Sequence, residues 1–489
     1  MLRSTAILFS ILASSICGIA AETPFFNTEE ICDTSSLEIE VLQNWKPSPK
    51  HPDIQQKLIE VTVCEWWDGQ KVRLPVTLNA PLKGLPCRNL IIANQGLSKK
   101  AFAPSGAQLD LLQKHGVGVV LIGMGTIDAM EPAGQLHLGM RGYLLKTKNV
   151  RYTPAWIWGM SQMRALTAAL TESEIFQPEK VITTGGSKRG VAAAAAGIHD
   201  DRFTAILPVV APIIKNPGTP TYVIGSEPEF ISVQNNKFFA NLDSGKLDLP
   251  DTTHDALDAR NERRSAIRVT LEQTKLAAWT EEDIKTMSEK VWDISRITNY
   301  LPEIKKRGLD YFYLVGTNDS VSPGLVELGR QHPDFPICII PGGQHGGPTT
   351  VGFTKQVPKL PLSSENFTAF AHHHFFGDRK LPGVPTISLK RNRELKQYLV
   401  SVQFSEGVEP ESNELWWSIN RNAPYTLPFE YDKWESSTME KTGVGRYEAA
   451  ILSVPTEQGQ IDFLSLHRHI ENGVPFTVSS PYQSITVKH

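Results

Sequence analysis

Residues 180–198 read KVITTGGSKRGVAAAAAGI, and this stretch decides the fold. An apolar, strand-like run leads into two glycines, Ser187 and a helix of small residues. That context is typical of a nucleophile elbow, a sharp strand-to-helix turn that lifts a serine hydroxyl to the top of a sheet. Gly185 fits the pattern Gly-x-Ser-x-Gly, but Arg189 stands where the second glycine belongs, and Gly190 follows it. An ordinary glycine-rich turn is the alternative.

Two later loops supply the partners that a nucleophilic serine needs. Asp319 follows the apolar run at residues 311–316, and His345 lies in a glycine-rich loop after the run at 337–340. The order Ser, Asp, His, with each residue after a strand, is that of the α/β-hydrolase triad. Taken singly, Asp319 is more often a turn residue and His345 a loop histidine. Together with the elbow they predict a catalytic triad.

The chemistry assigns a role to each triad residue. His345 accepts the proton of Ser187, because a free hydroxyl is a poor nucleophile at neutral pH. Asp319 fixes the tautomer of His345 and stabilises its cation. We therefore expect acyl transfer through Ser187.

The oxyanion of such a reaction needs two hydrogen-bond donors. The backbone N–H of Lys188, at the start of the helix, is the first candidate. A second should come from the loop after the strand that ends at Ala93, where Gly96 and Leu97 are the candidates. Gln95 in the same loop is a candidate for contact with the substrate.

Two adjacent cations beside the serine are unusual. Lys188 and Arg189 could supply a positive field that supports the oxyanion or holds a substrate carboxylate, and Arg189 is the candidate for substrate binding. The alternative is a pair of helix-face cations with carboxylate partners elsewhere, including a buried structural ion pair of Arg189.

Strand-like and helical runs alternate around the elbow, with helices expected at residues 101–115 and 154–171, and Asp68-Gly69 predicts a hairpin before them. This alternation predicts a parallel sheet with helices on both faces, and so an α/β fold. A long, mostly helical stretch of mixed charge at residues 212–301 interrupts it as an inserted cap. After residue 377 six short strand-like runs predict an all-β sandwich. These runs are residues 385–390, 397–404, 414–420, 446–454, 461–467 and 476–487.

The start of the chain resembles a secretory signal peptide. Arg3 precedes an apolar segment at residues 6–16, and small residues at 18–20 offer a cleavage site. The expected organisation is therefore a signal peptide at 1–20, an α/β-hydrolase domain at 21–378 with a helical cap at 213–305, and a β-sandwich domain at 379–489. Apart from this segment, no stretch is apolar enough to span a membrane.

Composition excludes several classes of protein. The chain has 489 residues, enough for two or three domains at roughly 150 residues each. Its 40% hydrophobic and 21% charged residues are ordinary globular values, which argues against disorder. A net charge of -3, with no block of five or more like charges, argues against a nucleic-acid partner.

Cysteines and histidines give little sign of a metal or cofactor. The mature chain keeps Cys32, Cys64, Cys87 and Cys338, of which the first three could form one disulfide and the last reads as a buried thiol. No Cys-x-x-Cys pair predicts zinc. Residues 372–374 are consecutive histidines, which point in different directions on a helix. We expect no metal and no cofactor.

The elbow, with the loops Gly-Thr-Asn-Asp at 316–319 and Gly-Gly-Gln-His at 342–345, resembles the PhoPQ-activated pathogenicity-related proteins. That family also includes secreted autocrine proliferation repressors. The resemblance implies an α/β-hydrolase with a helical insertion and an immunoglobulin-like C-terminal domain. It implies a site of Ser187, Asp319 and His345 but no firm substrate. The elbow is also similar to that of glucuronoyl esterases, Gly-Cys-Ser-Arg, with Gly186 in place of the cysteine.

These patterns predict an exported serine hydrolase, secreted or periplasmic. Carboxylic esters are the leading substrate class, and peptides cut at a chain end come second. The competing hypothesis is a secreted binding or signalling protein on a hydrolase scaffold, since a fold alone does not decide function. The expected partner is a small-molecule or peptide substrate, and no partner protein is indicated.

Overall fold

A computed structural model gives the fold of this chain. It describes residues 25–95, 100–124, 134–214, 269, 271–319, 321–322, 324–343, 362–392, 397–405, 408–421, 434–452 and 459–487. The proposed signal peptide and much of the proposed cap, residues 215–268, lie outside these ranges. No helix of the described part is both long and apolar enough to cross a membrane.

The larger part of the chain is built on one mixed sheet. Within the described residues it has ten strands, in the order β1-β2-β3-β5-β4-β6-β7-β9-β10, with β8 also paired to β7. From β5 to β10 all pairs are parallel, whereas β3 is antiparallel to both of its neighbours. This strand order with β3 reversed is that of the α/β-hydrolase fold, and it confirms the predicted fold class. The strands are β1 Glu40–Pro47, β2 Ile54–Trp67, β3 Gln70–Pro81, β4 Cys87–Gln95, β5 Gly118–Gly123, β6 Phe176–Gly186, β7 Ala205–Val209, β8 Asp310–Tyr311, β9 Tyr313–Gly316 and β10 Ile337–Ile340.

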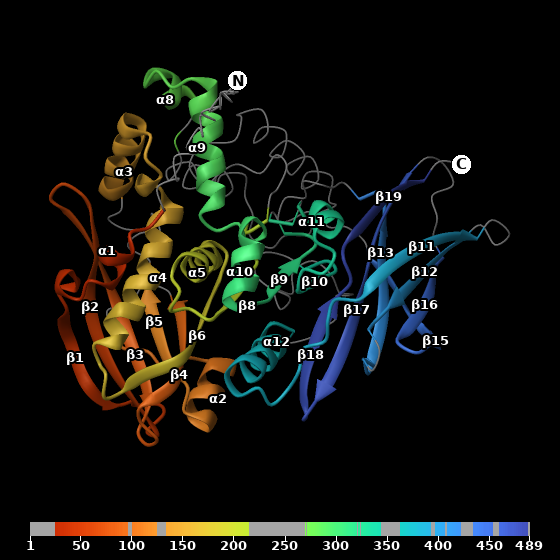
Figure 1. The fold of residues 1–489 in the computed structure, drawn as a ribbon, viewed down its shortest axis with the longest axis horizontal. Coiled ribbons are helices and arrows are strands. Elements are labelled where there is room, and N and C mark those ends of the chain that lie inside the picture. Colours follow the sequence, from red (N-terminus) through yellow and green to blue (C-terminus); the bar gives the residue numbers. More distant parts are fainter. Residues whose placement is uncertain are drawn as a thin grey trace, which may run out of the picture.

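Helices cover both faces of this sheet (Figure 1). Side chains of β4 alternate between the faces, so that Ile91 joins the core under α2 and α12, whereas Ile92 joins the core under α4 and α5. A strand buried on both faces must be apolar throughout, which explains the continuous hydrophobic runs. The described helices are α1 Thr28–Cys32, η1 Ser35–Leu37, α2 Gly106–His115, α3 Gly134–Thr147, η3 Val150–Tyr152, α4 Pro154–Leu170, α5 Lys188–His199, α8 Leu271–Leu276, α9 Glu281–Asp293, η4 Ile297–Tyr300, α10 Leu301–Arg307, α11 Leu325–Gln331, α12 Leu362–Ala371 and η5 His372–Phe376.

Local sequence explains where the main elements begin. Thr153 caps α4 by accepting a hydrogen bond from the N–H of Trp156 at 3.3 Å, and Pro154 occupies the first turn, where its missing N–H costs nothing. Gly69, with φ 75°, closes the hairpin between β2 and β3. The expected hairpin and the helix at 154–171 are therefore confirmed.

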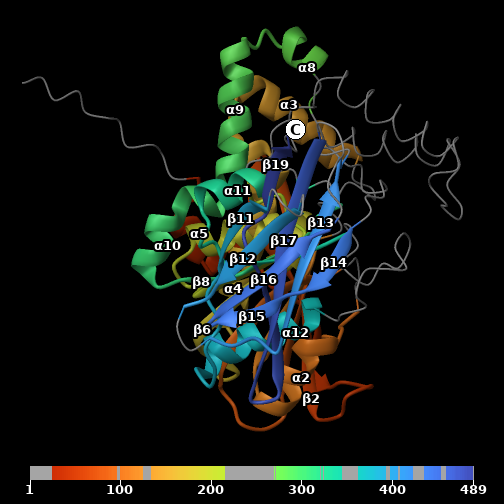
Figure 2. The same cartoon turned by 90° about the vertical axis from the view of Figure 1, so that its right-hand side faces the viewer.

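Helices α8 and α9 of the proposed insertion stand at the carboxyl edge of the sheet, and η4 and α10 follow them. After β5 the chain passes through α3 before α4 returns it to the start of β6, so α3 lies at that edge. Figures 1 and 2 show α8 and α9 beside α3. Lys148, after α3, pairs with Asp283 at 2.7 Å, and the indole N–H of Trp279 donates to the carbonyl of Leu145 at 2.9 Å. Trp279 thus packs helices together.

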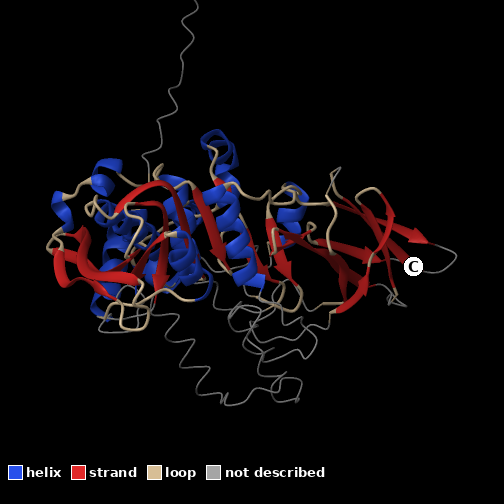
Figure 3. Cartoon of the chain, turned by 90° about the horizontal axis from the view of Figure 1, so that it is seen from below, coloured by secondary structure: helices blue, strands red, loops and turns tan. Residues whose placement is uncertain are grey.

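Beyond residue 377 the described chain contains strands and no helix (Figure 3). Two antiparallel sheets, in the orders β11-β12-β16-β15 and β14-β13-β17-β18, confirm the predicted β-sandwich, and β19 pairs with β17. The strands are β11 Thr386–Asn392, β12 Gln397–Gln403, β13 Ser412–Ile419, β14 Glu435–Thr438, β15 Glu440–Gly443, β16 Arg446–Ile451, β17 Gly459–Glu471, β18 Val474–Ser479 and β19 Gln483–Val487.

Several sequence expectations need correction. The run at 476–487 is two strands, because Pro481 lies between β18 and β19, and β1, β14 and β15 were not predicted. The helix expected from residue 101 begins at Gly106, after Pro104. No disulfide forms among the first three cysteines, since Cys32, Cys64, Cys87 and Cys338 are all free thiols.

The sandwich packs directly against the sheet of the larger part. The rings of Phe312 and Phe476 lie 4.8 Å apart, and the side chain of Asn366 exchanges two hydrogen bonds with the backbone of Thr477, at 2.8 and 2.9 Å. The amide of Ile339 in β10 donates to the hydroxyl of Ser479. The last parallel strands of the larger sheet are therefore covered by the sandwich.

Candidate active site

Ser187 occupies the turn between β6 and α5 in a strained backbone conformation. Its φ of 56° and ψ of -130° lie in a region that glycine adopts freely and other residues avoid. Strain of this kind persists only where the surrounding structure enforces it, and it gathers at functional sites. The geometry is what the elbow pattern predicts for a serine raised above a sheet.

Close packing explains the unusual glycine spacing of the elbow. A Cβ on Gly185 would lie 2.5 Å from the carbonyl oxygen of Arg189, so strand and helix could not approach as they do. A Cβ on Gly190 would lie 2.5 Å from the Cβ of Ala211, just after β7. The contact with β7 thus falls on residue 190, and Arg189 can replace the usual glycine because its own side chain is half-buried rather than enclosed.

Hydrogen bonds hold the turn on both sides. The N–H of Ser187 donates to the carbonyl of Val209 at 2.9 Å, and its carbonyl accepts from Gly190 and Val191 at 2.8 and 3.1 Å. Lys188 is the first residue of α5, where N–H groups lack an acceptor within the helix and the helix dipole is positive. The arrangement therefore suits an anion beside the serine.

Buried hydrogen bonds hold the end of β6, directly before the elbow. The hydroxyl of Thr183 donates to the side-chain oxygen of Gln162 at 2.9 Å, and the hydroxyl of Thr184 donates to the carbonyl of Leu207 at 2.7 Å. All of these side chains are buried. Sequence reasoning missed this support, although a glutamine within the apolar helix at 154–171 was a visible signal.

Asp319 lies in a buried turn immediately after β9. Its side chain has no solvent exposure, and its Oδ1 accepts a hydrogen bond from the N–H of Val321 at 3.1 Å. The hydroxyl of Ser322 donates to the carbonyl of Asp319 at 2.6 Å and also to that of Thr317 at 2.9 Å. We call residues 317–319 the acid loop. A buried carboxylate on a fixed loop suits the orienting role in a triad.

The acid loop is joined to the loop that leads to His345. The N–H of Asn318 donates to the carbonyl of Gly343 at 2.9 Å, and the N–H of Gly342 donates to the hydroxyl of Thr317 at 2.8 Å. A Cβ on Gly316 would lie 2.1 Å from the Gly343 oxygen. The backbone is thus packed against the acid loop up to residue 343, two positions before His345.

One continuous path connects the elbow with the acid loop. Val209 accepts from the Ser187 amide, and the next residue, Val210, donates to the carbonyl of Leu314 in β9 at 2.7 Å. Because β6, β7 and β9 are parallel, Ser187 and Asp319 both follow strand ends at the same edge of the sheet. The structure therefore brings these two predicted residues to one edge.

Other predicted residues are described in part or not at all. Gln95 is the last residue of β4, which is parallel to β6, so its backbone reaches the same edge. Gly96, Leu97 and His345 lie outside the described residues. Lys188 and Arg189 are half-buried at the start of α5.

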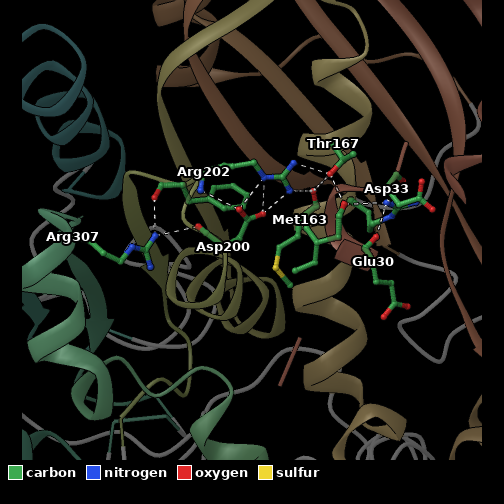
Figure 4. Close-up of polar contacts among 10 residues, drawn as sticks. Glu30, Asp33, Met163, Thr167, Asp200, Arg202 and Arg307 are labelled. Atoms are coloured by element: carbon green, nitrogen blue, oxygen red, sulfur yellow. Dashed lines mark hydrogen bonds and ion pairs between the residues drawn. The ribbon is translucent and has the colours of Figure 1, made fainter. Parts of the chain in front are cut away.

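The far end of α5 is fixed by arginines (Figure 4). The guanidinium of Arg307 donates to the carbonyls of Gly197 and Ile198 at 2.9 and 2.8 Å, and to those of Asp200 and Phe203 at 3.2 Å. A cation at a helix C-terminus is favourable, because the helix dipole is negative there. Arg202 adds a two-point pair with the Asp200 carboxylate. These contacts hold the helix whose first residue follows Ser187.

The consecutive histidines at 372–374 are structural. His374 lies between Asp310, at 2.7 Å from its Nδ1, and Thr204, at 2.7 Å from its Nε2. Asp310 is the first residue of β8 and Thr204 directly precedes β7, so both lie at the edge of the sheet opposite Ser187. His373 and His372 contact the Arg379 carbonyl and the Asp378 carboxylate instead. Among the described residues, no group of three or more such side chains could hold a metal ion.

Burial also changes the acidity of three cysteine thiols. Burial raises the pKa of Cys64, Cys87 and Cys338 to about 12, so each thiol stays protonated at neutral pH. A thiol rather than a thiolate neither ligates a metal well nor acts as a nucleophile.

Comparison with models of protein families finds a match to part of the chain. Residues 148–218 match the sequence model described as PhoPQ-activated pathogenicity-related protein. The matched segment contains α4, β6, the elbow, α5 and β7, and it confirms the resemblance to that family there. No curated protein matches the chain significantly.

Solved structures of similar fold are distant. Acetyl xylan esterase from Paenibacillus sp. R4 is 12% identical with a TM-score of 0.40, over 71% of this chain and 92% of that chain. Est1E from Butyrivibrio proteoclasticus is 13% identical with a TM-score of 0.33, over 63% and 97%. A glucuronoyl esterase from Solibacter usitatus is 15% identical with a TM-score of 0.25, over 37% and 53%. Likenesses this weak carry no conclusion about activity.

Proposed function

We propose that this chain, which resembles the PhoPQ-activated pathogenicity-related proteins in its elbow segment, is an exported serine hydrolase acting on carboxylic esters. The observation that carries the proposal is the strained conformation of Ser187 at the carboxyl edge of the sheet. A serine in an ordinary glycine-rich turn needs no such strain. The buried carboxylate of Asp319 at the same edge supports the same reading.

The proposed reaction has two halves. In the first, the hydroxyl of Ser187 attacks the ester carbonyl while His345 takes its proton and then gives it to the leaving alcohol. In the second, His345 takes a proton from water, which attacks the acyl-enzyme, and His345 returns that proton to the Ser187 oxygen as the acid is released. Asp319 holds the imidazole and stabilises its cation. The chemistry needs no cofactor or metal.

The oxyanion and the substrate have candidate partners at the same edge. The N–H of Lys188 and one from Gly96 or Leu97 are proposed to stabilise the oxyanion. Arg189 and Gln95 are proposed to contact the substrate. A cation on the first turn of α5 would favour esters that carry a negative group near the scissile carbonyl.

The insertion at 213–305 is proposed to cover the mouth of this site. Its helices α8 and α9 stand at the carboxyl edge (Figure 2), where ligands of open α/β sheets bind. A cap in this position would limit the size of the substrate.

A hydrolysis assay tests the proposal. The purified chain is offered a panel of carboxylic esters, acidic and neutral, and a panel of short peptides. We expect turnover of esters that falls by about 10⁴-fold or more in Ser187→Ala and in His345→Ala, because a triad works as a unit. Turnover of peptides alone would make the protein a peptidase of the same mechanism. Ester turnover that persists in folded Ser187→Ala would reject the proposal.

A further inference from the structure

We infer that Arg421, from the C-terminal β-sandwich, is a positioning residue for the active site of the larger part, because it holds the acid loop in place. This inference rests on the proposed function. The Arg421 guanidinium donates to the carbonyl of Thr317 at 2.7 Å and lies 3.5 Å from Oδ1 of Asn318. Both partners directly precede Asp319, the proposed catalytic acid.

A second residue of the sandwich contacts the same loop. The indole N–H of Trp434 donates to Oδ1 of Asn318 at 3.3 Å. The guanidinium of Arg421 lies over the Trp434 ring, 5.3 Å from its centroid, which adds a cation–π contact. Trp434 is 6% exposed and Asn318 is 1% exposed, so this contact is sheltered from water. Two side chains of the sandwich thus converge on one amide.

Arg421 is itself fixed by residues behind it. Its guanidinium donates to the hydroxyl of Tyr482 at 2.6 Å, and this tyrosine is buried. Tyr482 is in turn hydrogen-bonded to the buried carboxylate of Asp462, whose pKa is raised by burial and lowered in part by the charge of Arg421. The planar, forked guanidinium can bind Tyr482 and the acid loop at once, which a lysine could not do.

The acid loop is consequently held from two sides. Residues 340–343 bind it from the side that leads to His345, and the sandwich binds it from the other. These contacts on both sides fix the position of the Asp319 carboxylate. Removing the contacts from the sandwich would therefore allow the carboxylate to shift. Because a misplacement of about 1 Å can cost about 10²-fold in rate, contacts remote from the reacting atoms can matter for catalysis.

This arrangement gives the sandwich a role in the reaction. Besides covering β10, it completes the support of the proposed catalytic acid, so the larger part alone would lack a fully ordered triad. The role belongs to a specific pair of side chains and can be separated from simple packing between the two parts.

The test compares four variants of the full chain, one of which, Arg421→Lys, keeps the positive charge at this position. Arg421→Met removes the guanidinium, and Trp434→Phe removes the indole N–H but keeps a smaller aromatic ring under Arg421. Arg468→Met is the matched control, since Arg468 also joins the sandwich to the larger part, through Glu365 of α12 at 3.2 Å, without touching the acid loop. Each is measured for kcat, KM, the pH–rate profile and the melting temperature, with the best ester found.

Arg421→Met should lower kcat by about 10- to 100-fold with little change in KM. The acid limb of its kcat/KM profile should move to lower pH, because a displaced carboxylate stabilises the His345 cation less and so lowers the pKa of that histidine. Trp434→Phe should show a smaller change in the same direction, and Arg421→Lys should restore part of the rate. Arg468→Met should keep kcat and the acid limb of the wild type, whatever its melting temperature.

The inference is overturned if folded Arg421→Met keeps the kcat and the acid limb of the wild type. It is also overturned if Arg421→Met and Arg468→Met lose kcat equally and the acid limb moves in neither variant. If Arg421→Met does not fold, Trp434→Phe decides in the same way. Comparing the wild type with Ser187→Ala distinguishes failure of the proposed function from failure of the inference about Arg421. Without Ser187-dependent turnover in the wild type, the proposed function fails and the inference fails with it. With such turnover, a negative result in the variants rejects the inference alone.

Discussion

Ser187 has positive φ, although its side chain makes that conformation unfavourable. Replacing it by glycine relieves strain worth about 1–3 kcal/mol but adds about 0.5–1 kcal/mol of unfolded-state entropy. Ser187→Gly should therefore unfold with about 1 kcal/mol more free energy than Ser187→Ala, which keeps the strain. Urea denaturation of the two inactive variants checks this. A glycine variant less stable than the alanine variant would argue that the turn is relaxed.

Gly185 and Gly186 are adjacent, but only Gly185 has no room for a larger side chain. An added Cβ on Gly185 would lie 2.5 Å from the backbone oxygen of Arg189, whereas on Gly186 the nearest atom is the Val209 oxygen at 3.8 Å. Gly185→Ala should therefore lose activity and melt at a lower temperature, because the elbow cannot close. Gly186→Ala should keep the wild-type melting temperature. Equal behaviour of the two variants would contradict the described packing.

The sequence could predict where a residue lies when its neighbours along the chain explain its position. Ser187 and Asp319 each follow a recognisable strand, and their order carries information. Arg421 had no such signal, since its partners Thr317 and Asn318 lie about a hundred positions earlier in sequence. The pattern predicts a strained backbone at Ser187. It does not explain why the second glycine stands at position 190, because that depends on the position of Ala211 in the folded protein.

Helix α5 is the element whose placement matters most for the site, since its start follows the serine. Arg307 donates to carbonyls at its far end, and its removal leaves these groups without that donor. Arg307→Met should lower the unfolding free energy by about 1–3 kcal/mol. Arg330→Met, at an exposed pair with Glu327, is the control and should change it by less than about 0.5 kcal/mol. Equal effects in urea denaturation would mean that α5 does not depend on Arg307.

At the level of elements, periodicity predicted the buried strands and the long helix well. Exposed strands gave weaker signals. Strand β1 lies at the edge of the large sheet and is mostly exposed, and β15 is exposed throughout, so neither shows the buried alternation that betrays a strand. The single strand expected at 476–487 was wrong, although Pro481 within that run was a visible signal against one continuous strand.

The whole molecule should lose stability in mild acid. Burial lowers the pKa of His199 and of His469 to about 4, and that of His467 to about 3, from an ordinary value of 6.5. Between pH 6.5 and 4 the unfolded chain binds protons that the folded protein does not, so stability falls as pH falls. Each such histidine contributes a slope of up to about 1.4 kcal/mol per pH unit.

Urea denaturation at pH 7, 6 and 5 measures this loss. His467→Gln removes one of the three groups, so its unfolding free energy should depend less steeply on pH than that of the wild type. An unfolding free energy that stays constant between pH 7 and 5 would show that these histidines have the same pKa in the folded protein as in the unfolded chain.

The joining of the two parts was beyond prediction from sequence. Composition and periodicity predicted an α/β fold followed by a β-sandwich, and the structure confirms both. Contacts such as Phe312 with Phe476, or Arg421 with Thr317, depend on how two separately formed surfaces meet. No local sequence pattern predicts these contacts, because the residues that make them have the same pattern as other core or surface residues of their own segment.

The central claim is that Ser187 is an activated nucleophile, and covalent labelling tests it most directly. The wild-type chain is incubated with a fluorophosphonate probe, and the mass of the intact protein and of the peptide that contains residues 180–198 is measured. The account predicts one adduct per chain, located on Ser187, absent from Ser187→Ala and formed far more slowly in His345→Ala. An unlabelled but folded wild type, or an adduct that persists in Ser187→Ala, would contradict it.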